Sequence, residues 1–452
     1  MCVRKGYIMS KIVLIGANHA GTAAANTILD AGKGDTLTIF DRNSNISYLG
    51  CGTALFIGRQ IRGTEGLFYS SREVLEEKGA VIHMETEVTD IDFAGKTVSA
   101  RTADGATVTE SYDKLILATG SLPILPNIPG ADLENVHSVK LFQDGQAINA
   151  ALDNPEIKRV AVVGAGYIGV EIAESIQRRG KEALLFEAEN TSLASYYDPE
   201  FTKLMDGNLK EHGIELHFGE RINAINGAGR VQSVTTDKGT YDVELVILSI
   251  GFKPNTRLAG DSLERFDNGA FLVNLHQQTS DPDVYAIGDC ATVFNNATKK
   301  PDYIALATNA VRSGIVAASN LLGAPVESGG VQGSNGICIY GLNMVSTGLT
   351  LRQAAKHGFD ALKTDYADLQ KPAFIEQGNE QVQLRIVYDK ESRRILGAQM
   401  ASKMDISMGI HMFSLAIAKN VTIEELSLLD IFFLPHFNQP YNYITMAALG
   451  AE

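Results

Sequence analysis

Two short apolar runs, each followed by a glycine-rich turn, set the pattern of this chain. The first run is Lys11-Ile12-Val13-Leu14-Ile15, and the second is Arg159-Val160-Ala161-Val162-Val163. Apolar runs without polar alternation are typical of strands that are buried on both faces of a parallel sheet. Beyond the turns we predict helices over Thr22 to Leu29 and Val170 to Arg179. The pattern therefore predicts two units of strand, tight turn and helix.

Each unit continues into a second apolar strand that ends in an acidic residue. Leu37-Thr38-Ile39-Phe40 is followed by Asp41, and Leu184-Leu185-Phe186 is followed by Glu187. An acid about 20 residues beyond such a turn accepts hydrogen bonds from the ribose of a bound dinucleotide. Glu187 would also repel a 2′-phosphate, so we expect NADH to be preferred over NADPH.

The two turns match the dinucleotide fingerprint to different degrees. Gly16-Ala17-Asn18-His19-Ala20-Gly21 has Asn18 in place of the middle glycine, whereas Gly164-Ala165-Gly166-Tyr167-Ile168-Gly169 keeps all three glycines. The second turn is the stronger signal, because strand, helix and acid all stand at the right spacing. Two dinucleotide folds in one chain usually hold two different dinucleotides, one that delivers hydride and one that stays bound.

A third segment indicates which fold holds a flavin. A short strand, Val284-Tyr285-Ala286-Ile287, ends in Gly288 and Asp289. Such an aspartate can hold the ribityl chain of FAD, because the glycine lets the backbone approach the cofactor. A predicted helix over about 303–322 would direct its positive end at the flavin. We therefore assign FAD to the first fold and NADH to the second.

One cysteine stands between two glycines, in Ser47-Tyr48-Leu49-Gly50-Cys51-Gly52. Only a thiolate reacts, and a helix starting near Gly52 would lower the pKa of the Cys51 thiol. A buried structural cysteine is the alternative, but the two nucleotide signatures favour a redox role. His19 is either a helix-capping residue without a catalytic role or a catalytic base. Its expected position near the flavin and Cys51 favours the role of catalytic base.

The other cysteines argue against a disulfide scaffold or a metal site. Cys2, Cys290 and Cys338 lie far from Cys51 and from each other, and no CxxC pair occurs. We expect no bound metal and a reducing, cytoplasmic environment. Cys290 follows the predicted flavin-binding aspartate and Cys338 lies in an apolar strand, so we assign structural roles to both.

Composition narrows the class of partner. Of the 452 residues, 39 are Lys or Arg and 53 are Asp or Glu, which gives a net charge of −14. An acidic protein repels a phosphate backbone, so nucleic acid is not an expected partner. No run reaches the 18 or more apolar residues of a membrane span, and we expect no membrane association. Residues 1–8 are expected to be an upstream extension without a structural role.

The length predicts about three domains. We place an FAD-binding domain at 9–121 and 251–326, an NADH-binding domain at 122–250, and a C-terminal domain at 327–452. The last of these shows two strands and a helix from Ile406 to Ala418 but no nucleotide motif, which favours an interface domain that makes a homodimer. The default interpretation of the tail is a segment packed in the hydrophobic core, although the tail could instead cover the flavin of a partner subunit. Its sequence is Ile431-Phe432-Phe433-Leu434-Pro435-His436-Phe437-Asn438.

These segments together resemble a known family. The glycine turns, the Cys51 segment, Tyr285 to Cys290 and the phenylalanine-rich tail are similar to those of the flavoprotein NADH oxidases and NADH peroxidases of lactic acid bacteria, most closely the water-forming oxidases. The likeness covers Met9 to Glu452. It implies a glutathione reductase-like α/β fold, with two Rossmann-like dinucleotide-binding domains and an α+β C-terminal dimerisation domain. It also implies that Cys51 cycles between thiolate and sulfenic acid, with His19 as acid or base.

The motifs and the resemblance together give a set of candidate site residues. The FAD site is expected at Gly16, Asn18, Ala20, Gly21, Asp41, Cys51, Ala118, Thr119, Gly120, Lys140, Gly288, Asp289, Leu306, Ala307, Thr308 and Phe433. The NADH site is expected at Gly164, Gly166, Tyr167, Ile168, Gly169, Glu187, Tyr196, Gly251 and Gly336.

The resemblance implies a four-electron reaction, in which two NADH and one dioxygen give two waters. Disulfide reductases of the superfamily carry a second cysteine five residues after the first, where this chain has Phe56. Cys51 must therefore oxidise to a sulfenic acid or to a mixed disulfide with a small thiol. NADH peroxidase and coenzyme A disulfide reductase stay open as alternatives, and so does a flavin-containing redox sensor.

Overall fold

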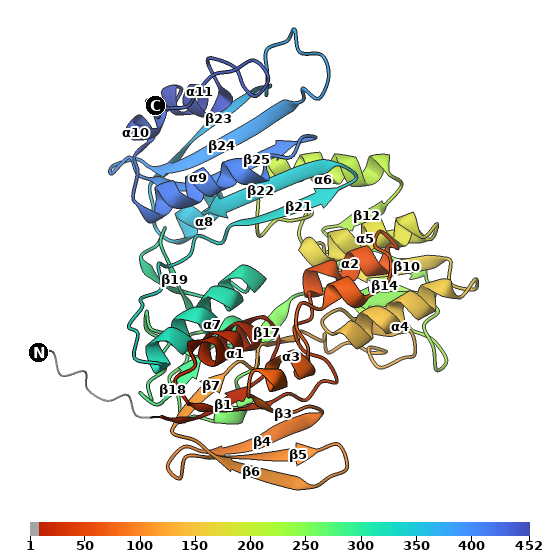
Figure 1. Cartoon of the computed structure of the whole chain (residues 1–452). Helices are drawn as coiled ribbons and strands as arrows, with labels where there is room; N and C mark the ends of the chain where they lie inside the picture. The colour runs from red at the N-terminus through yellow and green to blue at the C-terminus, as the bar shows by residue number, and fades with distance from the viewer. Residues whose placement is uncertain (1–8) are drawn as a thin grey trace, which may run out of the picture.

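The computed structural model describes residues 9–452, so the expectation for residues 1–8 lies outside them. A five-stranded parallel sheet has the order β18-β7-β1-β2-β3 (Figure 1). Its strands are β1 Lys11–Ile15, β2 Thr36–Phe40, β3 Val81–His83, β7 Lys114–Leu117 and β18 Val284–Ala286. Helices α1 (His19–Ala31) and α7 (Ala307–Leu321) lie side by side and share a core with Ile12 and Leu14 of β1.

The opposite face of this sheet is covered as well. Val13 and Ile15 of β1 pack in a second core with residues of the antiparallel meander β4 (Thr86–Asp92), β5 (Thr97–Thr102) and β6 (Thr107–Ser111). A strand that is buried on both faces must be apolar throughout, which is why the run in β1 shows no alternation.

The second nucleotide-binding unit repeats the arrangement of the first. Its parallel sheet has the order β12-β11-β10-β16-β9. The strands are β9 Val136–Ser138, β10 Arg159–Val163, β11 Glu182–Glu187, β12 Glu215–Phe218 and β16 Leu245–Leu248. The helices are α4 Phe142–Asp153, α5 Tyr167–Arg178 and α6 Pro199–Glu211, and the meander is β13 Ile222–Asn226, β14 Ser233–Thr236 and β15 Thr240–Asp242.

The two chain segments that connect these units form a short two-stranded β-sheet with each other. Strand β8 (Ser121–Pro123) leaves the first sheet, β17 (Phe252–Pro254) returns to it, and the two are antiparallel. The remaining short elements are α2 Thr53–Ile57, α3 Arg72–Glu77, β19 Val293–Asn295 and β20 Lys300–Asp302.

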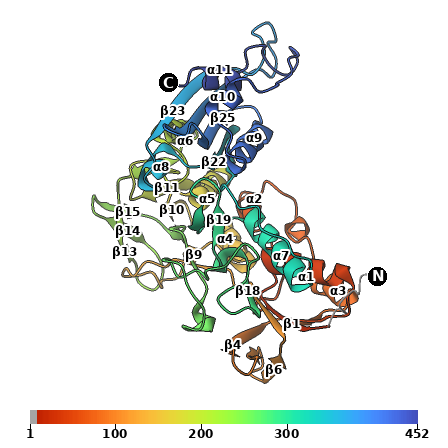
Figure 2. The same cartoon turned by 90° about the vertical axis from the view of Figure 1, so that its left-hand side faces the viewer.

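The C-terminal part is an antiparallel sheet of order β21-β22-β25-β24-β23, with helices packed against it (Figure 2). Its strands are β21 Asn335–Ile339, β22 Leu342–Gly348, β23 Ala361–Leu369, β24 Gln381–Asp389 and β25 Ile395–Ser402. Its helices are α8 Leu351–Lys356, α9 Ser407–Ala418, α10 Ile423–Ser427 and α11 Tyr443–Leu449. The domain boundaries proposed from the sequence stay a prediction.

Helix starts differ from those predicted. Helices α1 and α5 begin three residues early, at His19 and Tyr167, because Gly16 and Gly164 adopt φ of 97° and 101° and complete the turn at once. Helix α7 begins later, at Ala307, because Leu306 is extended with φ −137° and ψ 139°. Within residues 9–452, no helix combines the length and the apolar character needed to cross a bilayer.

Candidate active site

A large cavity lies where the carboxyl ends of the two parallel sheets face each other. Its volume is about 1780 Å³, well above the roughly 300–1,000 Å³ of an ordinary small-molecule pocket. Residues that follow β1, β2, β7, β10, β11, β16 and β18 line it. Ligands of open α/β sheets bind at such carboxyl ends. All the candidate site residues except Gly169 and Phe433 line this cavity.

The glycines of the second turn have different tasks. A Cβ on Gly164 would come 2.6 Å from the carbonyl oxygen of Ser249, and one on Gly169 would come 1.8 Å from that of Gly164. A Cβ on Gly166 would meet nothing within 4 Å. The outer glycines are thus required by backbone packing, and the middle one leaves open space in the cavity where a pyrophosphate can approach.

The two predicted acids are held in the same way. One oxygen of Asp41 accepts from the N–H of Ala17 (2.7 Å), and one oxygen of Glu187 accepts from the N–H of Ala165 (2.8 Å). The other oxygen accepts from the backbone two residues further on, at Asn43 and Glu189. Burial raises the pKa of Asp41. Each carboxyl is fixed at the edge of the cavity with lone pairs left for ribose hydroxyls.

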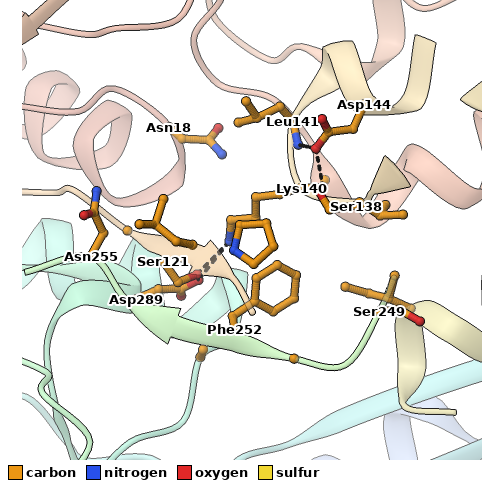
Figure 3. A pocket seen from close by; sticks show the side chains of 18 of the residues that line it. Asn18, Ser121, Ser138, Lys140, Leu141, Asp144, Ser249, Phe252, Asn255 and Asp289 are labelled. Atoms are coloured by element: carbon orange, nitrogen blue, oxygen red, sulfur yellow. Dashed lines mark hydrogen bonds and ion pairs between the residues drawn. The ribbon is translucent and has the colours of Figure 1, made fainter. Parts of the chain in front are cut away.

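A polar cluster stands in the middle of the cavity (Figure 3). The ammonium of Lys140 donates to Ser121 Oγ (2.8 Å) and lies 3.4 Å from Asp289 Oδ2, and Ser121 Oγ donates to that oxygen at 2.9 Å. Lys140 also stands over the ring of Phe252, 4.6 Å from its centroid. This cluster joins residues from β8, β17, the segment before α4 and the turn that follows β18.

Three helix N-termini open into the cavity without a side-chain cap. They belong to α1, α5 and α7, whose N-cap residues are Asn18, Gly166 and Leu306. Uncapped N–H groups and the positive end of the helix dipole attract anionic groups. Two such ends suit two pyrophosphates, and the third suits a ring system that gains negative charge.

Cys51 lies in the one-turn segment Gly50–Gly52 and its side chain is exposed to the cavity. The prediction of a lowered thiol pKa is wrong. Burial, followed by the charge of Glu171, raises the pKa of Cys51 above its ordinary value, and only its own backbone N–H and Lys140 oppose this. Helix α2 is five residues long, so its dipole is too weak to reverse the effect of burial.

His19 lines the same cavity at the start of α1. Its Nδ1 is 3.1 Å from the hydroxyl of Tyr69, and the two rings are stacked with centroids 5.7 Å apart. Burial lowers the pKa of His19, and Asp289 and Lys140 act on it in opposite directions. The ring is therefore neutral near pH 7, with Nε2 left for proton exchange.

Sequence reasoning missed several residues that line the cavity. Glu171 stands two residues after Gly169 and faces the cavity; burial and the nearby Glu174 raise its pKa to about 7. Its position two residues after the glycine turn could have predicted that Glu171 lies near the cavity. Arg42 follows Asp41 directly, so its position beside the predicted acid was a similar signal. Arg257 begins the 3-10 helix Arg257–Ala259, which no motif in the sequence marks.

Two candidates lie outside the cavity. Gly169 packs behind the turn against Gly164, as its backbone contact shows. Phe433 is exposed in the C-terminal tail and does not line the cavity of its own chain. The structural interpretation of Cys290 agrees with its complete burial and with a thiol within hydrogen-bond distance of the carbonyl oxygens of Leu117 and Ile287. Cys338 is exposed on β21, so its surroundings do not support the structural role predicted for it. No cluster of metal-ligand type occurs within residues 9–452.

The chain matches two family models of known proteins. Residues 10–314 match the pyridine nucleotide-disulphide oxidoreductase model, and residues 335–442 match the dimerisation domain of the same family. The chain belongs to the pyridine nucleotide-disulphide oxidoreductases. This membership confirms the predicted fold class and the predicted oxidoreductase class, with FAD and a pyridine nucleotide as cofactors.

Individual relatives are similar over nearly the whole chain. A protein named NADH oxidase from Streptococcus pyogenes is 60% identical, over 98% of this chain and 100% of its own length. Another of that name, from Lactococcus lactis, is 58% identical over the same shares of the two chains. Among solved structures, the water-forming NADH oxidase of Lactobacillus brevis bound to NADH has 38% identity and a TM-score of 0.94, covering 97% of both chains. These matches confirm the resemblance drawn from the motifs.

Proposed function

We propose that this oxidoreductase is an NADH oxidase that reduces dioxygen by four electrons to two waters. One observation carries the proposal: among the cysteines that the structure describes, only the exposed Cys51 lines the cavity, which the candidate FAD and NADH residues also line. Cys290 is buried behind that cavity, and Cys338 lies on β21 of the C-terminal sheet. A lone thiol cannot form an internal disulfide, so it is suited to reduce peroxide.

The residues present fit FAD in the first unit. Asp41 would hold the adenosine ribose, the uncapped N-terminus of α1 the pyrophosphate, and Asp289 the ribityl chain. Lys140 and the N-terminus of α7 would meet the flavin ring. When bound, FAD would take electrons from NADH and pass them to dioxygen.

The second unit fits NADH. Gly166 would leave room for the pyrophosphate at the N-terminus of α5, and Glu187, which lines the cavity, would accept from the ribose. A carboxylate here favours a ribose hydroxyl and opposes a 2′-phosphate. NADH is therefore proposed to be preferred over NADPH.

Cys51 would complete the reduction to water. Its thiolate attacks one oxygen of hydrogen peroxide, so that an S–O bond forms and the O–O bond breaks. The leaving hydroxide takes a proton from solvent, or from His19 after its neutral ring has accepted the thiol proton of Cys51, and becomes the first water. Two electrons from a second NADH then reduce the sulfenic acid to thiolate and release the second water. A reducing compartment such as the cytoplasm would keep Cys51 in this cycle.

The stoichiometry of the reaction tests this proposal. We expect one dioxygen consumed for two NADH oxidised, and no change of this ratio when catalase is added. One dioxygen for each NADH, with oxygen returned by catalase, would identify a peroxide-forming oxidase instead. Oxidation of NADH that requires added peroxide, or added coenzyme A disulfide, would identify one of the two alternative enzymes.

We also propose that the protein is a homodimer. The matched dimerisation domain supports this, as does an exposed apolar tail that contains Phe432, Phe433 and Phe437. In a dimer, Phe433 of the partner would contact the flavin, since it does not line the cavity of its own chain. Sedimentation should give twice the 48.7 kDa mass of the chain.

A further inference from the structure

Two hydroxyl groups meet directly behind the redox cysteine. The phenol oxygen of Tyr48 is 2.5 Å from Thr53 Oγ1, and Thr53 Oγ1 is 2.7 Å from the carbonyl oxygen of Gly50. Tyr48 and Thr53 are each 3% exposed. Because buried polar atoms without partners are costly, both hydroxyls depend on this chain of contacts.

The direction of these hydrogen bonds follows from the groups involved. The Gly50 carbonyl only accepts, so Thr53 must donate its single hydroxyl hydrogen to that carbonyl. Tyr48 must then donate to Thr53 Oγ1. Burial also raises the pKa of Tyr48, so the phenol keeps its hydrogen throughout the neutral range. The donor chain runs from Tyr48 through Thr53 to the Gly50 carbonyl.

The carbonyl at the end of this chain belongs to the peptide bond between Gly50 and Cys51. A peptide unit is planar, with the C=O and N–H bonds pointing in opposite directions. The Gly50 oxygen accepts from both the backbone N–H and the hydroxyl of Thr53, and holding this oxygen fixes the direction of the Cys51 N–H. The Cys51 N–H is one of the groups that lower the pKa of the Cys51 thiol, as a donor to its thiolate does.

Packing holds the two hydroxyls in place. The ring of Tyr48 contacts Phe68 and Phe142, with centroids 5.6 and 5.5 Å away. Gly145 of α4 lies beside the pair, where a Cβ would come 3.0 Å from the methyl group of Thr53. The pair thus joins the Cys51 turn to α4.

We propose that Tyr48 and Thr53 are positioning residues for Cys51, and that their hydroxyls hold the Gly50–Cys51 peptide so that its N–H faces the sulfur. This inference rests on the proposed function, because it takes Cys51 to be the redox thiol. It goes further in naming residues that decide how much of that thiol is thiolate. Neither hydroxyl acts on a substrate.

The test is the pH profile of Cys51 alkylation in Thr53→Val, which has the shape of threonine but no hydroxyl. The holoenzyme is reduced, kept free of oxygen and treated with iodoacetamide from pH 6 to about 10. We expect the midpoint to rise by about 0.5 to 1 unit, so that alkylation at pH 7 slows about three- to tenfold. The plateau rate at high pH should not change, because access to the sulfur is unaltered.

Two further variants separate positioning from stability. Thr53→Ser keeps the donor and should keep the midpoint of the unmodified chain. In Thr53→Val the Tyr48 hydroxyl loses its acceptor, and the double variant Tyr48→Phe with Thr53→Val removes this buried unpaired group. We expect the double variant to recover thermal stability but to keep the raised midpoint.

An unchanged midpoint in Thr53→Val would overturn the proposal, and so would recovery of the midpoint in the double variant. A change confined to the plateau rate would also overturn it, because it would show altered access rather than altered thiolate stability. The assay needs no turnover with oxygen, so it stays informative if the oxygen stoichiometry disproves the oxidase.

Discussion

Burial sets the ionisation of the side chains that face the cavity. It raises the pKa of the Cys51 thiol, lowers that of the His19 ring, and brings that of Glu171 to about 7. A neutral histidine can exchange a proton at Nε2, and a thiol that is only partly ionised depends on its neighbours for thiolate. The reactivity of Cys51 is therefore controlled by nearby residues more than by the residue itself.

Cys51→Ser should separate the two halves of the proposed reaction. A serine hydroxyl does not reduce peroxide, so we expect NADH oxidation to continue with about one hydrogen peroxide released for each NADH. Peroxide is measured by the oxygen that catalase returns. Cys338→Ser, on β21, is the control and should release almost none. Water as the product of Cys51→Ser would remove Cys51 from the reaction.

Glu171→Gln should lower the pKa of the Cys51 thiol by roughly one unit. Above about pH 7 the native carboxyl is negative and opposes the thiolate, whereas below that pH it is neutral and does not. The gain in alkylation rate should therefore appear above pH 7 and fade below pH 6. Glu211→Gln, at the exposed end of α6, should leave the profile unchanged. A gain that is equal at all pH values would contradict an effect of charge.

Among the helices and strands, the two glycine turns show how one local pattern serves two purposes. In both units the N–H of the first glycine donates to the end of the second strand, from Gly16 to Phe40 and from Gly164 to Phe186, each at 2.8 Å. The outer glycines let helix and strand approach, and the middle position faces the ligand. Asn18 takes that middle position in the first turn and lines the cavity.

Substitution of the glycines in the second turn should distinguish packing from binding. Gly166→Ala points its Cβ into open space at φ −73°, so we expect an unchanged Tm and an NADH KM raised about tenfold or more. Gly169→Ala places its Cβ 1.8 Å from a carbonyl oxygen, so we expect a loss of stability. Thermal melts and NADH titrations of the two variants measure this. Equal effects on Tm would refute the division of roles.

In the molecule as a whole, an ion cluster around a buried arginine ties the second nucleotide-binding unit to the C-terminal sheet, with one carboxylate buried and two about half exposed. Arg385 of β24 is 2% exposed and lies within 3.3 Å of carboxylate oxygens on Asp198, Glu200 and Asp365. Gln399 of β25 exchanges hydrogen bonds with Asp198 at 2.6 and 2.7 Å. The segment that follows Tyr196, a residue of the cavity wall, is thus fixed to the C-terminal sheet.

Arg385→Met should destabilise the protein by roughly 3–5 kcal/mol, because it leaves a buried carboxylate without its cation. The free energy of unfolding in urea measures the loss. Lys390→Met removes a surface pair with Asp360 in which both side chains are more than half exposed, and it should cost less than about 1 kcal/mol. Similar losses in both variants would show that the buried cluster contributes no more than a surface pair.

The sequence by itself determined the local units of this protein. Strand, glycine turn, helix and acid were recognisable at both sites, as was the lone cysteine between glycines, because each depends on backbone periodicity and spacing within about 25 residues. Sequence resemblance also named Lys140, Tyr196 and Gly336, which no local pattern predicts and which line the cavity. The helix starts were misplaced because a single positive-φ glycine or an extended leucine shifts a boundary by several residues.

Only the tertiary structure decided how these units act on one another. It placed Glu171 near Cys51, paired His19 with Tyr69, and left Phe433 outside the cavity of its own chain. It also reversed the expected pKa shift of Cys51, since burial outweighs a helix of five residues. Burial and charge depend on segments far apart in the chain, and no local spacing encodes them.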